Sequence, residues 1–262
     1  MFITNPYITI GWDNNALQYI SSVEQADQQP LEYKTRIAYN NFIKGCKSDG
    51  IWNAIKASCI LAGARTLSGA LVPLVGSAPT NNNFVTGDYN RKTGLKGDGL
   101  TKYININRNN NLDPNTNRHF SIWATDMTTT INRVIFGGGW SSNGGNELRN
   151  GATTSFNTRI SSSASVATSV ASSFTTGLKG CFRNNSSNYT FRNNLSNTLI
   201  TNTVSNVASG QTAVFAGINS LGTVSTPWPG RLSFYSIGES LDLALLDARV
   251  STLMTDLAAA IP

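Results

Sequence analysis

The chain has 262 residues, enough for one large domain or two small ones, and a chain of this size buries a core that needs neither disulfides nor a metal. Charged residues make up only 13% of it, about half the usual share, and asparagine alone outnumbers the 14 acidic residues. The net charge of +6 comes from basic residues scattered singly. It does not come from a stripe of cations with stacking aromatics, which argues against nucleic acid as a partner.

Neither a disulfide framework nor a secretory leader is indicated. The cysteines are Cys46, Cys59 and Cys181, an odd number without the Cys-x-x-Cys spacing of zinc sites. The N-terminus lacks the cationic start and apolar stretch of a signal peptide, and the most apolar window contains Arg65 and Pro73, which makes it a poor membrane span. We therefore expect synthesis in a reducing cytoplasm, without membrane insertion and without a cofactor.

Residues 1–34 are expected to form an extended attachment segment, because alternation runs from Tyr7 to Trp12 and helical periodicity is weak. The segment is too apolar for a free tail, since disordered regions are poor in aromatic and β-branched residues. Its alternation suits a strand added to the edge of a neighbouring sheet. The residues expected to anchor it to another subunit are Phe2, Ile3, Tyr7, Ile8, Ile10 and Trp12.

A helical lead-in is predicted over residues 35–74. Ala38, Phe42 and Cys46 stand four positions apart, which places them on one apolar stripe of a helix, and Gly50 is a stop signal. A second, shorter helical stretch is expected around Trp52, whose side chain suits core packing. Because this region is too small to build a core of its own, we expect it to pack against the rest of the chain.

Residues 75–262 are predicted to form the main β domain, because the apolar residues there repeat with a period of two. Short alternating runs rich in aromatic and β-branched residues are separated by Asn, Gly, Ser and Pro clusters; the runs are KYINI, HFSIWATDM, RVIFGG, NYTFRN, TAVFAGI and RLSFYSI. This pattern predicts a mainly β fold built as a sandwich or a barrel.

Two further segments of this domain have their own patterns. Residues 160–177 are low in complexity but compatible with a strand pair around Val166 and Val170. A closing helix is predicted at 240–260, with Ser240 as its N-cap and with an apolar face of Leu241, Leu245, Val250 and Leu253.

The sequence does not indicate a hydrolytic site. Glycoside hydrolysis needs two carboxyl groups at a set separation, yet Glu147 is the only glutamate amid the predicted strands and has no acidic residue two or four places away. The single histidine, His119, has no nucleophile motif beside it. We therefore predict a protein without catalytic residues, while a pairing of Glu147 with an aspartate distant in sequence stays open.

Residues 113–117 place oxygen side chains at alternate positions, as the first half of a calcium-binding loop does. Arg118 stands where such a loop needs glycine, and Ala124 stands where it needs glutamate. The stretch therefore predicts a turn, and no metal is expected. Calcium held by separate loops stays open as an alternative.

The candidate ligand-binding residues lie in the segment 137–151, where one tryptophan stands among glycines and amides. Sugar binding uses an aromatic face for the apolar C–H surface and amide, carboxylate or guanidinium groups for the hydroxyls. The alternative is a long glycine-rich hairpin whose tryptophan closes one end of the sandwich. The candidates are Trp140, Asn143, Asn146, Glu147 and Arg149.

Three quoted stretches resemble a group of bacteriophage virion proteins: NNFIKGCKSDGIWNAIKA, SGALVPLVGSAPTNNNFVTGDYNRKTGLKGDGLTKYININ and GRLSFYSIGESLDLALLDARVSTLMTDL. The resemblance runs from about residue 35 to the end. It implies an antiparallel two-sheet jelly roll of the concanavalin A-like (laminin-G or pentraxin-like) type, with a helical lead-in and a closing helix. It brings no catalytic or metal-binding residues.

The same resemblance implies a surface appendage of the virion, of the tail-fibre or head-fibre type, that attaches to the host surface. Its expected partners are other virion proteins and a host cell-surface glycan, and a homo-oligomer is expected, with a trimer favoured by analogy. Two alternatives stay open: a capsid or baseplate component without a ligand, and a polysaccharide depolymerase, against which the missing carboxyl array argues.

Overall fold

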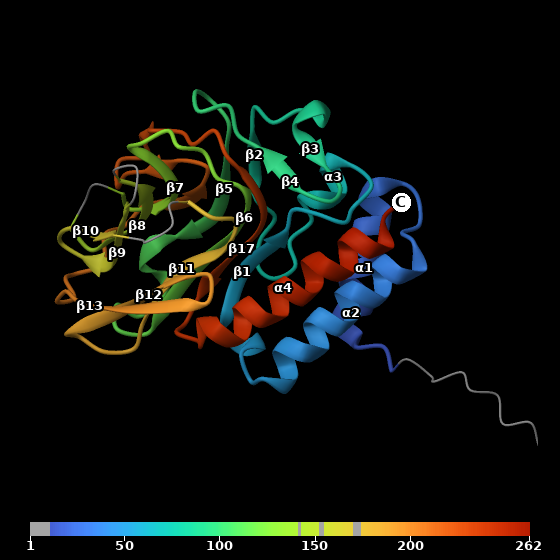
Figure 1. Ribbon diagram of the computed structural model, residues 1–262, viewed down its shortest axis with the longest axis horizontal. Coiled ribbons are helices and arrows are strands. Elements are labelled where there is room, and N and C mark those ends of the chain that lie inside the picture. Colours follow the sequence, from blue (N-terminus) through green and yellow to red (C-terminus); the bar gives the residue numbers. More distant parts are fainter. Residues whose placement is uncertain (1–10, 141–142, 152–154, 170–173) are drawn as a thin grey trace, which may run out of the picture.

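Two facing antiparallel sheets and a layer of helices make up the computed structural model, which describes residues 11–140, 143–151, 155–169 and 174–262 (Figure 1). Each sheet contributes one face to a shared apolar core. There Phe120 from one sheet stacks on Phe136 from the other, with ring centroids 4.4 Å apart. The mainly β sandwich expected from the alternating runs is confirmed, together with helices before and after it.

Sheet A has eight strands in the described residues and contains both an early and a late part of the chain. Its order is β13 (Ser196–Thr201), β12 (Asn188–Asn193), β11 (Gly177–Arg183), β6 (Arg118–Asp126), β17 (Arg231–Gly238), β4 (Gly94–Lys96) and β3 (Tyr89–Asn90), and β1 (Ile55–Ile60) also pairs with β17. Residues alternate between two apolar environments: Cys181 points to the shared core, whereas Leu178 points to the helices.

Sheet B forms the other half of the sandwich. Its order is β10 (Val166–Ser169), β9 (Ser155–Ser162), β8 (Gly145–Asn150), β7 (Arg133–Gly138), β14 (Gln211–Val214), β5 (Tyr103–Asn109) and β2 (Thr80–Asn82), with β15 (Gly217–Ile218) beside β7 and β16 (Val224–Ser225) beside β15. Leu148, Phe156 and Ile160 face the shared core. Because side chains alternate along a strand, their neighbours in β8 and β9 face outward.

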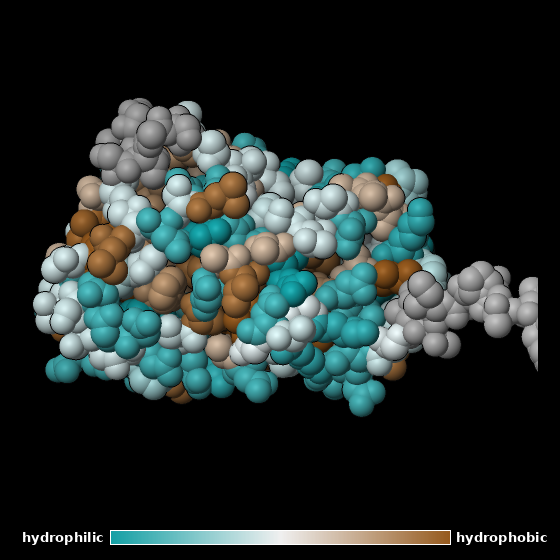
Figure 2. Space-filling view, turned by 60° about the horizontal axis from the view of Figure 1, so that its bottom comes forward, coloured by the Kyte–Doolittle hydropathy of each residue, from teal (hydrophilic) through white to brown (hydrophobic). Residues whose placement is uncertain are grey.

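Helices cover the outer face of sheet A (Figure 1). They are α1 (Asn14–Asp27), α2 (Tyr33–Ser48), α3 (Leu67–Ala70) and α4 (Leu243–Ala260). The described residues also contain the short 3-10 turns η1 (Trp52–Ala54), η2 (Thr86–Asp88) and η3 (Asn110–Leu112). Phe42 of α2 meets Phe234 of β17 edge to face, with ring centroids 5.8 Å apart. The surface seen in Figure 2 is mainly hydrophilic, with separate hydrophobic patches.

Helix α1 corrects the prediction that residues 1–34 are extended. Asp13 caps the helix by accepting a hydrogen bond from the backbone N–H of Asn15 at 2.9 Å, and Ala16, Tyr19, Ile20 and Val23 are buried at helical spacing. Packing on α2 and α3 gives this short helix the apolar partner that its weak periodicity did not reveal. The proposed anchors from Phe2 to Ile10 lie outside the described residues.

The sixth anchor, Trp12, belongs to the helical layer of its own chain. It is half-buried against this layer, and its ring lies 6.5 Å from that of Tyr33, centroid to centroid.

A second correction concerns residues 35–74, which are not purely helical. The stretch around Trp52 is a single 3-10 turn, and β1 follows it as a strand of sheet A. Its alternating Ala57 and Cys59 fill the shared core.

The closing helix is confirmed with shifted details. Its N-cap is Asp242, which accepts from the backbone N–H of Ala244 at 2.8 Å, instead of the predicted Ser240. Leu253 and Val250 are buried as expected, whereas Leu245 is 38% exposed. The helix begins two residues later than a Ser240 cap implies. Leu245 is exposed because the five-residue step from it to Val250 places the two side chains roughly 140° apart around the helix.

Candidate ligand-binding site

A shallow cavity lies on the outer face of sheet B, where β8 and β9 run side by side. It has a volume of about 340 Å³. We call it the Trp140 cavity; its lining residues are Trp140, Glu147, Arg149, Arg159, Ala164 and Ser165. Strand alternation places its charged residues outward, because Leu148 between two of them points to the core.

A carboxylate held between two guanidinium groups forms the floor of the cavity. Glu147 is only 3% exposed, and one of its oxygens lies 2.7 Å from Nε of Arg149. Its other oxygen lies 3.2 Å from Nε of Arg159, which stands directly opposite Glu147 on β9. Burial lowers the pKa of Arg159 from its ordinary value, and the facing carboxylate opposes that shift. The two ion pairs therefore hold Glu147, Arg149 and Arg159 in a fixed arrangement.

Trp140 lies against the backbone of β15 because Gly217 leaves room for its ring, and Gly137 lets β15 approach β7 closely. A Cβ atom on Gly217 would come within 2.8 Å of the indole Cγ, and one on Gly137 would come within 2.9 Å of the Gly217 Cα. The backbone N–H of Trp140 donates to the Ile218 carbonyl at 2.8 Å. The indole is half-buried and lines the cavity, so it is held in place while part of it stays accessible.

The structure brings together three of the five predicted ligand-binding residues, namely Trp140, Glu147 and Arg149. Asn146 instead points into the sandwich, where its side chain donates to Asn110 at 2.7 Å and accepts from the backbone of Ser161 at 3.0 Å. A one-residue step along β8 separates it from Glu147, and such a step reverses the face.

Asn143 is exposed in the turn between β7 and β8 and does not line the cavity. Trp140 itself is half-buried, and the tryptophan of the shared core is Trp228. The residue missed from the sequence is Arg159. Its alternation with Phe156 and Ile160 indicates an outward side chain, but its pairing with Glu147 depends on strand register.

Histidine and cysteine side chains, which act as acids or nucleophiles in many enzymes, are buried in this protein at His119, Cys46 and Cys59. His119 donates from Nδ1 to the Glu239 carbonyl and accepts at Nε2 from the Ser236 hydroxyl at 2.8 Å. Burial lowers the pKa of His119 to about 4, so its ring is neutral near pH 7. Burial also raises the pKa of both Cys46 and Cys59 to about 12, which keeps these thiols protonated.

The turn at residues 113–117 is held by arginines. Arg108 binds the two carboxylate oxygens of Asp113 at 2.6 and 3.2 Å, and Arg118 donates to the Asn110 carbonyl at 2.7 Å. Among the described residues no group of three or more His, Cys, Asp or Glu side chains could hold a metal. In the same part of the chain, no helix is both long and apolar enough to cross a bilayer.

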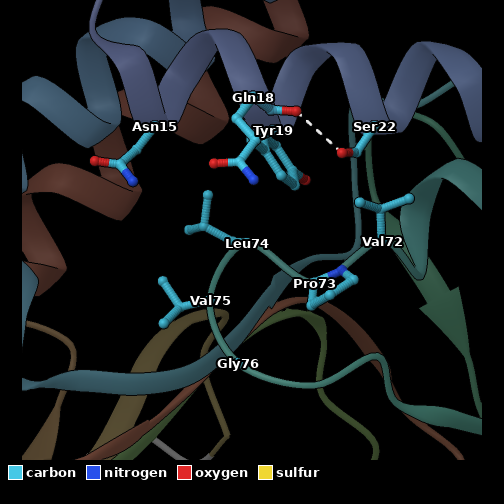
Figure 3. A pocket seen from close by; sticks show the side chains of 9 residues that line it. All are labelled: Asn15, Gln18, Tyr19, Ser22, Val72, Pro73, Leu74, Val75 and Gly76. Carbon is cyan, nitrogen blue, oxygen red and sulfur yellow. Dashed lines mark hydrogen bonds between the residues drawn. The ribbon is translucent and has the colours of Figure 1, made fainter.

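A second cavity, of about 320 Å³, lies between α1 and residues 72–76 (Figure 3). Asn15, Gln18 and Ser22 point into it from the helix, and the opposite wall consists of Val72, Pro73, Leu74 and Val75. The Ser22 hydroxyl donates to the Gln18 carbonyl at 3.0 Å. No charged side chain lines this cavity and its only aromatic residue, Tyr19, is buried, so it offers less to a polar ligand than the Trp140 cavity does.

No protein-family model matches the chain, and no curated protein matches it in sequence. Among solved structures it is similar to the binding domain of botulinum neurotoxin serotype D, with 10% identity and a TM-score of 0.49 over 76% of this chain and 51% of that one. It is similar to domain 4 of AbnA, an extracellular arabinanase from Geobacillus stearothermophilus in complex with arabinotriose, with 12% identity and a TM-score of 0.39 over 65% and 87%.

A mutant of the Trypanosoma rangeli sialidase displaying trans-sialidase activity matches with 10% identity and a TM-score of 0.47, over 82% of this chain and 38% of the sialidase. The chain thus spans about half of the neurotoxin structure and less of the sialidase. At these identities and scores the similarities assign neither a ligand nor an activity to the chain.

Proposed function

We propose that this chain is a lectin-like, non-catalytic β-sandwich that binds a glycan at the Trp140 cavity and is displayed on a bacteriophage virion appendage for attachment to the host surface. One observation carries the proposal: a half-exposed tryptophan lies beside a carboxylate that two arginines fix in place, on an open sheet face.

The cavity offers both kinds of group that a sugar ring requires. The face of Trp140 matches the apolar C–H surface of a pyranose, and the guanidinium of Arg149 can donate hydrogen bonds to hydroxyls while the buried Glu147 carboxylate holds that guanidinium in place. The two ion pairs hold these groups in place before a ligand arrives, which reduces the entropy lost on binding. A volume of about 340 Å³ lies in the range typical of small-molecule sites.

Binding without cleavage is the form of the proposal that the charges favour. Glycoside hydrolysis uses two carboxyl groups across the scissile bond. Among the described residues lining the cavity, Glu147 faces two arginines and no second carboxylate. A depolymerase acting at this site therefore lacks half of its required machinery.

The virion setting rests on the sequence resemblance of residues from about 35 to 262. We propose that Phe2 to Ile10 attach the chain to another virion protein, which leaves the sandwich and its Trp140 cavity to project outward. The tail-fibre or head-fibre position and the trimeric assembly belong to the same proposal by analogy.

A structural component without a ligand is the second candidate. It is favoured by the contact between Trp140 and Gly217, because an indole at van der Waals distance from β15 also stabilises that strand. The two functions differ in what the removal of Trp140 changes: ligand binding in one, and the free energy of unfolding in the other.

The test is adsorption to host cells together with glycan-array binding by the full chain. Trp140→Ala is expected to reduce binding at least tenfold with a small change in melting temperature, and Trp140→Phe to retain most of it. Trp52→Ala is the control, since Trp52 is also a half-buried tryptophan but lies in the helical layer. A large stability loss in Trp140→Ala, with no glycan bound by the parent, supports the structural candidate. Release of reducing sugar by the parent supports the depolymerase.

A further inference from the structure

We infer that the glycan bound at the Trp140 cavity is acidic, with a sugar carboxylate seated on Arg149 while the ring lies on Trp140. This inference rests on the proposed function and specifies its ligand class. It follows from the balance of charge in the cavity and from the different roles of its two arginines.

The cavity carries an uncompensated positive charge. Its charged lining residues are Glu147, Arg149 and Arg159, which leaves a net charge of +1. Sequence neighbours do not cancel this charge, because Glu147 is the only acidic residue between Asp126 and Glu239, a stretch that holds seven basic residues. An anion is therefore the ligand that completes the charge balance of this site.

Arg149 and Arg159 have different roles in the cavity. Arg159 is buried and stands opposite Glu147 in register, so its charge is committed to holding that carboxylate. Arg149 has a side chain that is 23% exposed and reaches Glu147 through Nε, the inner nitrogen of the guanidinium. Beyond this contact, the outer edge of the guanidinium is formed by its two terminal NH₂ groups. These groups can bind the two oxygens of a planar carboxylate in parallel.

The arrangement also fixes where the carboxylate sits relative to the ring. Trp140 and Arg149 line the same cavity and are each anchored, one by the Ile218 carbonyl and the other by Glu147. A sugar whose ring lies on the indole therefore brings its substituents to the guanidinium. Uronic and sialic acids combine a pyranose ring with a directly attached carboxylate, which is the pair of groups that the cavity can receive.

The test compares each acidic probe with its own neutral form. Oligogalacturonate and oligosialic acid are presented to the full chain beside their carboxyl-reduced counterparts, and affinities are measured at low and at high salt. The parent is expected to bind at least one acidic probe at least tenfold more tightly than its reduced form, with affinity falling as salt increases. Arg149→Gln is expected to remove this preference. Arg149→Lys is expected to keep part of it, because lysine retains the positive charge but lacks the paired NH₂ groups of the guanidinium.

Arg133→Gln is the matched control, because it removes one positive charge from β7 at a residue that does not line the cavity. It is expected to keep the preference for the acidic probe. Binding of neutral and acidic glycans with equal affinity, lost in Trp140→Ala but not in Arg149→Gln, overturns the inference and leaves the proposed function standing. Preference for sulfated glycans over carboxylated ones also overturns it. No binding to any glycan or host cell overturns the proposed function itself.

Discussion

The two sheets have the same alternating strands but opposite outer faces. On sheet A the outward positions hold residues such as Leu178 and Phe234, and helices bury them. On sheet B at β8 the outward positions hold Glu147 and Arg149, with glycines on the adjacent β7 and β15, and no helix of the described residues covers them. The comparison shows that one strand pattern serves two purposes. Apolar outward residues pack under a layer of helices, whereas the paired charges of sheet B bind one another on a face that no described helix covers, which we call the open face.

The largest effect is expected from breaking the covered face. Phe42→Ala removes a ring that packs edge to face on Phe234 in the buried helical layer, and truncation of such a residue costs about 3–5 kcal/mol of unfolding free energy. Urea unfolding followed by circular dichroism measures it. Leu221→Ala, at a position 89% exposed, is the control and should change stability by less than about 0.5 kcal/mol. A similar cost for both variants contradicts the assignment.

The open face is expected to depend on its ion pairs for stability. Glu147→Ala leaves the buried guanidinium of Arg159 without its carboxylate, and we expect the free energy of unfolding to fall by about 3 kcal/mol. Most of this loss should come from Arg159, because the Arg149 side chain is more exposed to solvent. The double variant Glu147→Leu/Arg159→Leu should recover much of this loss, because two apolar side chains leave no buried charge. Chemical denaturation of the three proteins tests this. Equal stability of the single variant and the parent contradicts the role of the pair.

A pH dependence is expected on the covered face. The ordinary pKa of histidine is 6.5, and that of buried His119 is about 4, so between these values the unfolded chain binds more protons than the folded chain. Stability therefore falls as the pH is lowered from 6.5 to 4.5, by about 2–3 kcal/mol. Urea unfolding at these two pH values measures it. His119→Gln should lack this part of the pH dependence, and an identical slope in parent and variant refutes it.

The smallest change in stability is expected from Gly217→Ala on the open face. A methyl group there would meet the indole of Trp140 at 2.8 Å and displace it. We expect glycan binding to fall about tenfold while the free energy of unfolding changes by about 1 kcal/mol. Gly87→Ala is the control, because a Cβ atom there meets no atom within 4 Å. Glycan binding and melting curves are measured for both variants. Unchanged glycan binding in Gly217→Ala would show that the position of the Trp140 ring does not matter for the ligand.

The sandwich could be predicted because its strands carry their own signal. Runs such as HFSIWATDM and RLSFYSI alternate, and they are β6 and β17. Helix α1 could not be separated from an extended segment, because its apolar residues pack on α2 and α3, which only the fold brings beside it. The same holds for Arg159. Its outward direction is readable from Phe156 and Ile160, but its partner is set by the register of two strands.

The position of β17 has a consequence for how the chain is made. This strand, at residues Arg231–Gly238, pairs with β6, β4 and β1, so the middle of sheet A is supplied late in the sequence. A nascent chain emerging from the ribosome therefore exposes the unpaired edges of β1 and β6 until β17 has emerged as well. We therefore expect sheet A to be completed only after this strand has emerged, and not progressively from the N-terminus. Until then its open strand edges are prone to pair with other chains.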